Sequence, residues 1–383
     1  MKVKSILIAA HNYPTPTDPV HTFLEQLVLA LSRMDIKVTV IAPYHILQHY
    51  LRHTELHPRR RVIEVVDGVS VTVLQPRYFA LSNRFKKFNL KQATKVVCKE
   101  AFRLKEKPDI CYGHFWHWAW SIHPYARRNN IPLFVNTSET PIVLQDIIPF
   151  EHLKGFIDYV SGVVCASSYC KDQSVARRLT VDNKCKVIPN AINNALFFKQ
   201  DKVIIRKKHG YNESDFIVAY IGWFSSMKGS DRLSEAITKL NDKDIKSFFI
   251  GSPKGHGTAN PTCEGILHIG RLPHNKIPEY LNMADIFVLP TLAEGCCNAI
   301  IEAMACGLPI VSSNLPFNRD VLNERNSIMV DSMNVDEIAT AIKTLKDDRN
   351  KRNKMAQSAI ETAAGLTIDR RAVRIINFIE SKL

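Results

Sequence analysis

The chain has 383 residues, which is too long for one compact core and fits two domains. Its apolar and charged fractions, 45% and 23%, are typical of a globular protein and argue against a disordered or fibrous chain. The nine cysteines are scattered and include no Cys-x-x-Cys pair. This usage predicts free thiols in a reducing cytoplasm and disfavours a structural zinc site. No apolar run is long enough for a signal sequence or a membrane span.

The formal net charge is +14, and much of the excess lies in residues 59–61 and 84–107. The second segment alternates cationic and apolar side chains at helical spacing. Such a basic amphipathic helix suits an anionic membrane face or an acidic acceptor. A solvated helix face with its apolar side in the core is the favoured interpretation, because basic helix faces are common. Nucleic acid is not expected as a partner, since no recognisable nucleic-acid-binding module is present.

The first half of the chain alternates apolar runs with segments of helical periodicity. The expected strands are 5–10, 37–42, 62–66, 69–74, 110–112, 133–135 and 163–166, and the expected helices are 22–33, 122–128 and 169–178. Asp67-Gly68 predicts a hairpin turn between two of these strands. Strand–helix–strand alternation is typical of a parallel sheet covered by helices.

The alternation restarts after a polar segment, 197–208, which is interpreted as a connector. The expected strands are 216–221, 247–250, 267–269, 286–289 and 310–312, and the expected helices are 231–240, 276–283 and 298–305. The sequence therefore predicts two Rossmann-like α/β domains, 1–193 and 194–365, with a cleft at the carboxyl ends of their strands. Residues 366–383 form an amphipathic helix that is expected to pack back on the N-terminal domain.

The strongest local signal is the stretch from Glu294 to Ser313, which follows an expected strand. The chain leaves the sheet in a loop that carries Glu294, and Gly295 permits a tight backbone path. A helix then begins near Asn298, so that its first amide groups are available for a diphosphate. Glu302 lies about one turn inside this helix. A carboxylate there can accept hydrogen bonds from the two hydroxyls of a ribose.

This stretch resembles the Glu-x7-Glu motif of the retaining family-4 glycosyltransferases, and the match extends through Glu-Ala-Met-Ala-Cys-Gly-Leu-Pro. The resemblance implies a GT-B fold, in which the two domains face each other across the cleft. It implies that Glu302 grips the donor ribose and that Glu294 contacts the transferred sugar. The residues between them that we expect at the donor are Gly295, Cys296, Cys297 and Asn298.

A second segment, Ala219 to Gly229, is similar to the Gly-Arg…Lys-Gly segment of the same family. The resemblance implies that Lys228 neutralises the leaving diphosphate and that Gly222 lies at the donor. Trp223 stands where the family usually has Arg. Arg271 is a candidate to supply the missing positive charge.

Weaker similarities point to residues in the first half of the chain. His21 and Thr22 lie in a stretch, Tyr13 to Gln26, that resembles the acceptor-side loop and first helix of capsule- and teichuronic-acid-type members, which implies acceptor binding. Asn136 falls where that branch often has the His that contacts the donor sugar, and an amide can still hold a sugar hydroxyl. His114 follows a strand within an aromatic cluster and is a further candidate, although such residues are more often part of a core.

We therefore expect transfer of a sugar from a UDP- or GDP-sugar to a glycan or lipid-linked acceptor in surface polysaccharide synthesis. Retention of anomeric configuration is implied by the resemblance. No Asp-x-Asp metal site is evident in the segments expected at the cleft, so no cofactor and no metal are expected. The expected location is cytoplasmic, and peripheral contact with the inner face of an anionic membrane is left open. Two alternatives also stay open: an inactive glycan-binding or partner subunit, and a nucleotide-sugar 2-epimerase.

Overall fold

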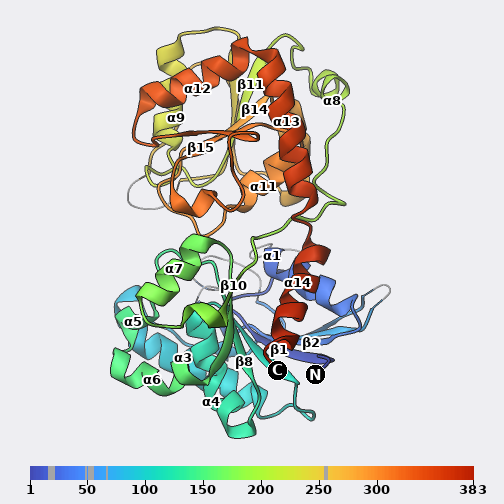
Figure 1. The fold of residues 1–383 in the computed structure, drawn as a ribbon, viewed down its shortest axis with the longest axis vertical. Coiled ribbons are helices and arrows are strands. Elements are labelled where there is room, and N and C mark those ends of the chain that lie inside the picture. The colour runs from blue at the N-terminus through green and yellow to red at the C-terminus, as the bar shows by residue number, and fades with distance from the viewer. Residues whose placement is uncertain (16–21, 48–49, 51–55, 66–67, 254–257) are drawn as a thin grey trace. The chain divides into compact units, whose positions relative to one another are not determined.

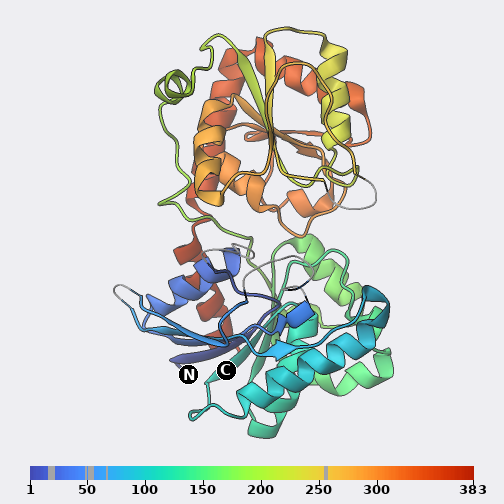
Figure 2. The same ribbon diagram turned by 180° about the vertical axis from the view of Figure 1, so that it is seen from behind.

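The fold is taken from a computed structural model that describes residues 1–15, 22–47, 50, 56–65, 68–253 and 258–383 (Figures 1 and 2). The chain divides into two compact units. Unit 1 comprises Met1–Ile188 with Ile368–Leu383, and unit 2 comprises Pro189–Thr367. The domain boundaries predicted from the sequence lie between residues 193 and 194 and between residues 365 and 366.

Unit 1 is built on one sheet, which has eight strands among the described residues in the order β10-β9-β8-β7-β1-β2-β5-β4. All neighbours are parallel except β4, which is antiparallel to β5. Asp67 of the predicted hairpin turn lies outside the described residues. The strands are β1 (Ser5–Ala9), β2 (Lys37–Ile41), β4 (Arg60–Ile63), β5 (Val71–Leu74), β7 (Ile110–His114), β8 (Leu133–Thr137), β9 (Val160–Cys165) and β10 (Cys185–Val187), beside a small pair, β3 (Tyr44–His45) and β6 (Arg77–Tyr78). The helices are α1 (Thr22–Ser32), α3 (Lys86–Ala101), α4 (Trp116–Asn129), α5 (Leu144–Ile147), α6 (Phe150–Tyr159), α7 (Ser168–Ala176) and α14 (Ile368–Glu380).

Helices cover both faces of the central strands of unit 1, as a parallel sheet requires. On one face, Leu7 and Val135 of the sheet join a buried cluster with residues of α3, α4 and α6. On the other face, α1 and α14 lie side by side (Figure 1). The last helix is therefore part of unit 1, and Val3 N donates to Glu380 Oε1 at 2.8 Å.

Unit 2 is a second parallel sheet, which has six strands among the described residues in the order β13-β12-β11-β14-β15-β16. These are β11 (Phe216–Ile221), β12 (Ile245–Ile250), β13 (Ile266–Gly270), β14 (Ile286–Leu289), β15 (Ile310–Ser313) and β16 (Ser327–Val330). The helices are α8 (Lys202–His209), α9 (Ser230–Leu240), α10 (Ile277–Met283), α11 (Asn298–Ala305), α12 (Val335–Asp347) and α13 (Arg349–Ala364). Buried β11 and β14 form its centre, so that the loops after them meet at one edge.

The connector prediction for 197–208 is wrong in part, because α8 occupies most of it. Asp201 caps this helix by accepting from the amides of Val203 and Ile204. The polar composition of the segment indicated an exposed connector, but Arg206 is fully buried in this helix. Its guanidinium donates to the main-chain oxygens of Met283 and Asp215, at 2.8 Å each.

The basic segment 84–107 forms α3 and buries Leu90, Ala93, Val97 and Ala101. Its apolar side lies in the core, as the favoured interpretation held. Phe85 and Phe88, however, remain exposed at its start. No helix in the described part of the chain is long and apolar enough to cross a bilayer.

Candidate functional site

The loop and helix after β14 have the predicted arrangement. The buried strand ends at Leu289, and α11 begins at Asn298 after a loop that carries Glu294. Cys297 occupies the N-cap position and makes no side-chain cap. The first amides of α11 are therefore not capped by that side chain and can bind an anion.

Lys228 and Glu294 form an ion pair although they are far apart in the sequence. Lys228 Nζ also lies 3.5 Å from the main-chain oxygen of Ala293. Both side chains are partly buried, which strengthens their attraction relative to an exposed pair. The structure thus brings the two predicted donor residues of the β11 and β14 loops together.

Gly229 allows this approach. It has φ +75°, and a Cβ at this position would lie 2.6 Å from the main-chain oxygen of Pro290. Leu292 N donates to Met227 O at 2.8 Å across the same contact. The backbone of the Lys228 loop therefore packs directly on the end of β14.

The loops after β11 and β12 also approach closely. A Cβ on Gly251, whose φ is +158°, would lie 1.8 Å from the carbonyl oxygen of Gly222. Arg271 follows β13 and donates from Nε to Ser252 Oγ at 2.8 Å. Its guanidinium lies over the Trp223 ring, 5.4 Å from the centroid. The predicted substitute cation therefore lies against the residue that replaces the family Arg.

Glu302 lies in α11 and is partly buried, and its Oε1 is 3.1 Å from His274 Nε2. His274 was not predicted as a site residue; its position in the loop after β13, beside Arg271, is the signal that could have indicated it. Near the start of α11, Asn298 Oδ1 is buried without a hydrogen-bond partner in the described structure, which leaves an acceptor available.

The neighbouring Cys296 and Cys297 are free thiols. Burial and the nearby Glu294 carboxylate raise the pKa of Cys297 well above its ordinary value. This thiol therefore stays protonated near neutral pH and is a poor nucleophile.

Two of the predicted residues of unit 1 lie at the carboxyl ends of its strands. His114 ends β7 and Asn136 lies beside it in β8, paired in register. Both are buried, with exposed fractions of 4% and 1%. Asn136 Oδ1 accepts from Arg371 of α14 at 3.2 Å, which gives the amide a structural partner. Thr22 begins α1, whereas His21 lies outside the described residues.

No cluster of three or more His, Cys, Asp or Glu side chains that could hold a metal occurs among the described residues. A further concave site lies in unit 1, but none of the predicted site residues lines it. The predicted donor residues, Lys228, Glu294, Asn298 and Glu302 among them, all belong to unit 2.

Two family models match the chain in succession. Residues 20–196 match the Glycosyltransferase Family 4 model, and residues 201–362 match the model of Glycosyl transferases group 1. With the two Rossmann-like sheets, these matches make the chain a glycosyltransferase of GT-B fold that uses nucleotide sugars. The Family 4 match thus precedes the group 1 match along the chain.

Relatives and solved structures agree with this assignment. The chain is 25% identical over 372 residues to TuaC of Bacillus subtilis (strain 168), a glycosyltransferase assigned to teichuronic acid biosynthesis, and the alignment covers 91% of each chain. It is 24% identical over 333 residues to D-inositol 3-phosphate glycosyltransferase of Mycobacteroides abscessus, covering 80% of this chain and 74% of the relative.

Among solved structures, the fold is similar to sucrose-phosphate synthase from Thermosynechococcus elongatus, with a TM-score of 0.77, 16% identity and coverage of 99% and 98%. It is also similar to Anabaena HepE in complex with UDP and glucose, with a TM-score of 0.69, 16% identity and coverage of 99% and 100%.

Proposed function

We propose that this enzyme transfers a sugar from a UDP- or GDP-sugar to a hydroxyl of a growing glycan or lipid-linked acceptor in surface polysaccharide synthesis, with retention of configuration. The observation that carries the proposal is the Lys228–Glu294 pair beside the loop that leads into α11. The similarity to TuaC supports the acceptor class, and the UDP complex of HepE supports a nucleotide sugar.

The chemistry divides between the two ends of the bond that breaks. As the bond from the sugar carbon to the diphosphate oxygen lengthens, negative charge accumulates on the diphosphate. Lys228 and the first amides of α11 supply preorganised positive potential for it. Glu294 contacts the transferred sugar and Glu302 holds the ribose hydroxyls. The acceptor oxygen forms the new bond to the sugar carbon, and its proton passes to the departing diphosphate oxygen.

Metal independence belongs to the same proposal, because a lysine and helix amides can neutralise a diphosphate without a divalent cation. Donor turnover in the presence of EDTA is therefore expected to equal turnover in added Mg²⁺. A strict requirement for Mg²⁺ would contradict this part of the proposal.

Calorimetric titration of UDP and GDP into the wild-type chain and into Lys228→Ala tests the donor site. Loss of one charge-assisted contact is expected to weaken the preferred nucleotide by about tenfold or more. Equal affinity in both proteins would overturn the assignment of Lys228. A product assay with a panel of nucleotide sugars distinguishes transfer from epimerisation, since a 2-epimerase releases an altered nucleotide sugar without acceptor.

We also propose peripheral contact with an anionic membrane, where a lipid-linked acceptor would be found. Support comes from the segment that precedes and begins α3, where exposed Phe79, Leu81, Phe85 and Phe88 are interspersed with cations such as Lys87. Flotation with phosphatidylglycerol vesicles is expected to recover the wild-type chain and to fail for Phe85→Ser/Phe88→Ser. Equal recovery of both proteins would contradict the membrane contact.

A further inference from the structure

One side of the unit 1 sheet is left partly uncovered. Helix α3 packs on α4 and reaches the sheet at β2 and β6, and residues of β2, β5 and β4 beside this contact line a groove. Thr39 and Thr72 lie side by side on this face, paired in register on neighbouring strands. Parallel sheets normally bury apolar side chains on both faces, so hydroxyls at these central positions are unusual.

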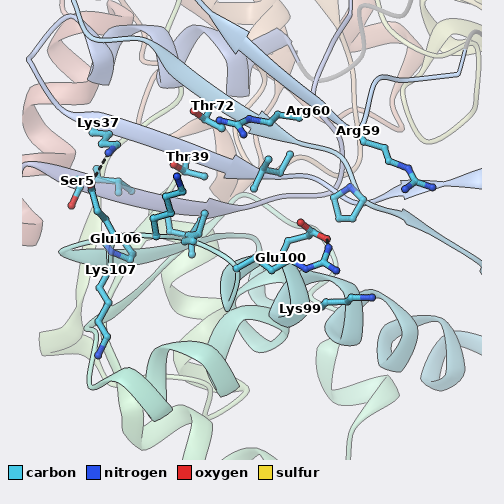
Figure 3. Close-up of a pocket in the computed structure, with 18 of the residues that line it drawn as sticks. Ser5, Lys37, Thr39, Arg59, Arg60, Thr72, Lys99, Glu100, Glu106 and Lys107 are labelled. Atoms are coloured by element: carbon cyan, nitrogen blue, oxygen red, sulfur yellow. Dashed lines mark hydrogen bonds and ion pairs between the residues drawn. The ribbon is translucent and has the colours of Figure 1, made fainter.

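The uncovered face forms the floor of a groove of about 790 Å³, with the C-terminal part of α3 and the loop after it as the opposite wall (Figure 3). In the close-up, Lys99 lies on the helix side and Arg59 and Arg60 lie on the sheet side. The floor and walls also include apolar groups such as Leu74 and Leu104. Hydroxyls, cations and apolar patches together suit a carbohydrate that carries negative charges.

The charge of the groove is strongly unbalanced. Its lining contains eight cationic side chains and two carboxylates: Lys37, Arg59, Arg60, Arg77, Lys99, Arg103, Lys105 and Lys107 against Glu100 and Glu106. Each carboxylate is already paired, since Arg103 Nη1 is 2.7 Å from Glu100 and Lys37 Nζ is 2.6 Å from Glu106.

The other six cations form no ion pair within the described parts of the chain. Arg77 Nε is also buried there without a hydrogen-bond partner. A buried donor that lacks a partner costs free energy, which an anionic ligand would recover. These observations point to a polyanion as the occupant.

One end of the groove lies next to the loop that follows β1. Gln75, which follows β5, contacts Asn12 and Tyr13 of that loop, and Arg61 Nη2 donates to Pro14 O at 2.6 Å. The loop after β1 is at the carboxyl edge of the sheet, where ligands of such sheets bind. A chain in the groove could therefore extend to the part of unit 1 that is expected to hold the acceptor.

We infer that this groove binds an acidic glycan, a polymer bearing carboxylate or phosphate groups, as a secondary subsite for the growing acceptor chain. The inference rests on the proposed transfer to a glycan and names the charge of that glycan. A lipid bilayer fits the groove less well, because its flat surface cannot reach the hydroxyls of Thr39 and Thr72 on a concave floor.

The test measures binding of an oligogalacturonate to the full chain, with a neutral malto-oligosaccharide of the same length as the control ligand. The wild-type chain is expected to bind only the acidic oligomer, with affinity that falls as salt rises. The variant Arg60→Gln/Lys99→Gln is expected to lose about tenfold in this affinity. The matched control Lys91→Gln/Lys95→Gln removes two exposed charges of α3 that do not line the groove, and it is expected to change little.

No binding of the acidic oligomer, or equal loss in both variants, would overturn the inference. Equal loss of phosphatidylglycerol vesicle binding and glycan binding in the groove variant would identify a membrane surface instead and would also overturn it. UDP titration of the same proteins separates the two proposals, because absent UDP binding contradicts the donor site and leaves the groove result standing.

Discussion

In this structure Lys228 and Glu294 satisfy each other's charge. A diphosphate that binds at Lys228 must compete with the Glu294 carboxylate for the same ammonium group. The ion pair therefore opposes nucleotide binding, whereas Glu294 is proposed to act on the sugar. The two effects of one residue can be separated by comparing a ligand with and without the sugar.

Glu294→Gln removes the competing charge and keeps the shape of the side chain. UDP is expected to bind about three- to tenfold more tightly, because a partly buried pair of this kind contributes on the order of 1 kcal/mol. Sugar transfer is expected to fall at the same time. Calorimetry with UDP and a turnover assay measure the two outcomes, and weaker UDP binding in the variant would contradict the competition.

We expect His274 to position Glu302, since His274 Nε2 lies 3.1 Å from one carboxylate oxygen and the proposed ribose contact can use the other. His274→Ala is expected to reduce the preference for UDP over 2′-deoxy-UDP, and His274→Gln is expected to retain most of it. The affinity ratio of the two nucleotides is the measurement. An unchanged ratio in His274→Ala would show that Glu302 is oriented without this contact.

At the scale of elements, strand and helix periodicity predicted most of both sheets, and α11 has the predicted bounds of 298–305. Contacts between residues far apart in the chain were harder to predict from the sequence. The Lys228 loop meets Glu294 only because β11 and β14 are neighbours, which no local pattern reveals. Helix α8 was likewise not predicted, because the burial of its charged Arg206 depends on partners elsewhere in the chain. The hydrogen bond from Arg371 to Asn136 depends on the packing of α14, which is far from Asn136 in the sequence.

Helix α14 stabilises unit 1, to which it belongs. Phe378 is buried, and its ring lies edge-on to Phe134 with centroids 6.4 Å apart. Phe378→Ala is expected to destabilise unit 1 by about 3 kcal/mol through the lost contacts and the cavity. Exposed Val373→Ala on the same helix is the control. Thermal unfolding measures both, and UDP affinity should be unchanged because the proposed donor residues lie in unit 2.

For the whole molecule, the division into two units predicts separate responses to acid. In unit 2 the buried Asp285 carboxylate accepts from Arg206 Nη2 at 2.7 Å and from Ile217 N at 2.8 Å. Burial alone would raise the pKa of Asp285, but the charges of Lys202 and Arg206 outweigh it and hold the pKa below its ordinary value. The stability from this ionised group is therefore complete above the ordinary Asp pKa of about 3.9, and it is lost as pH falls through the lower folded value.

Asp285→Asn should remove this part of the pH dependence and destabilise unit 2 by about 3 kcal/mol at neutral pH, because the buried Arg206 loses its counter-charge. Scanning calorimetry from neutral pH to below the ordinary Asp pKa of about 3.9 follows the onset of this loss, and the transition that UDP shifts upward identifies unit 2. Asp336→Asn, which removes the exposed partner of Lys239, is the control and should behave like the wild type. If the unfolding temperature of unit 2 fell with acid as steeply in Asp285→Asn as in the wild type, the acid sensitivity would have to come from other carboxylates.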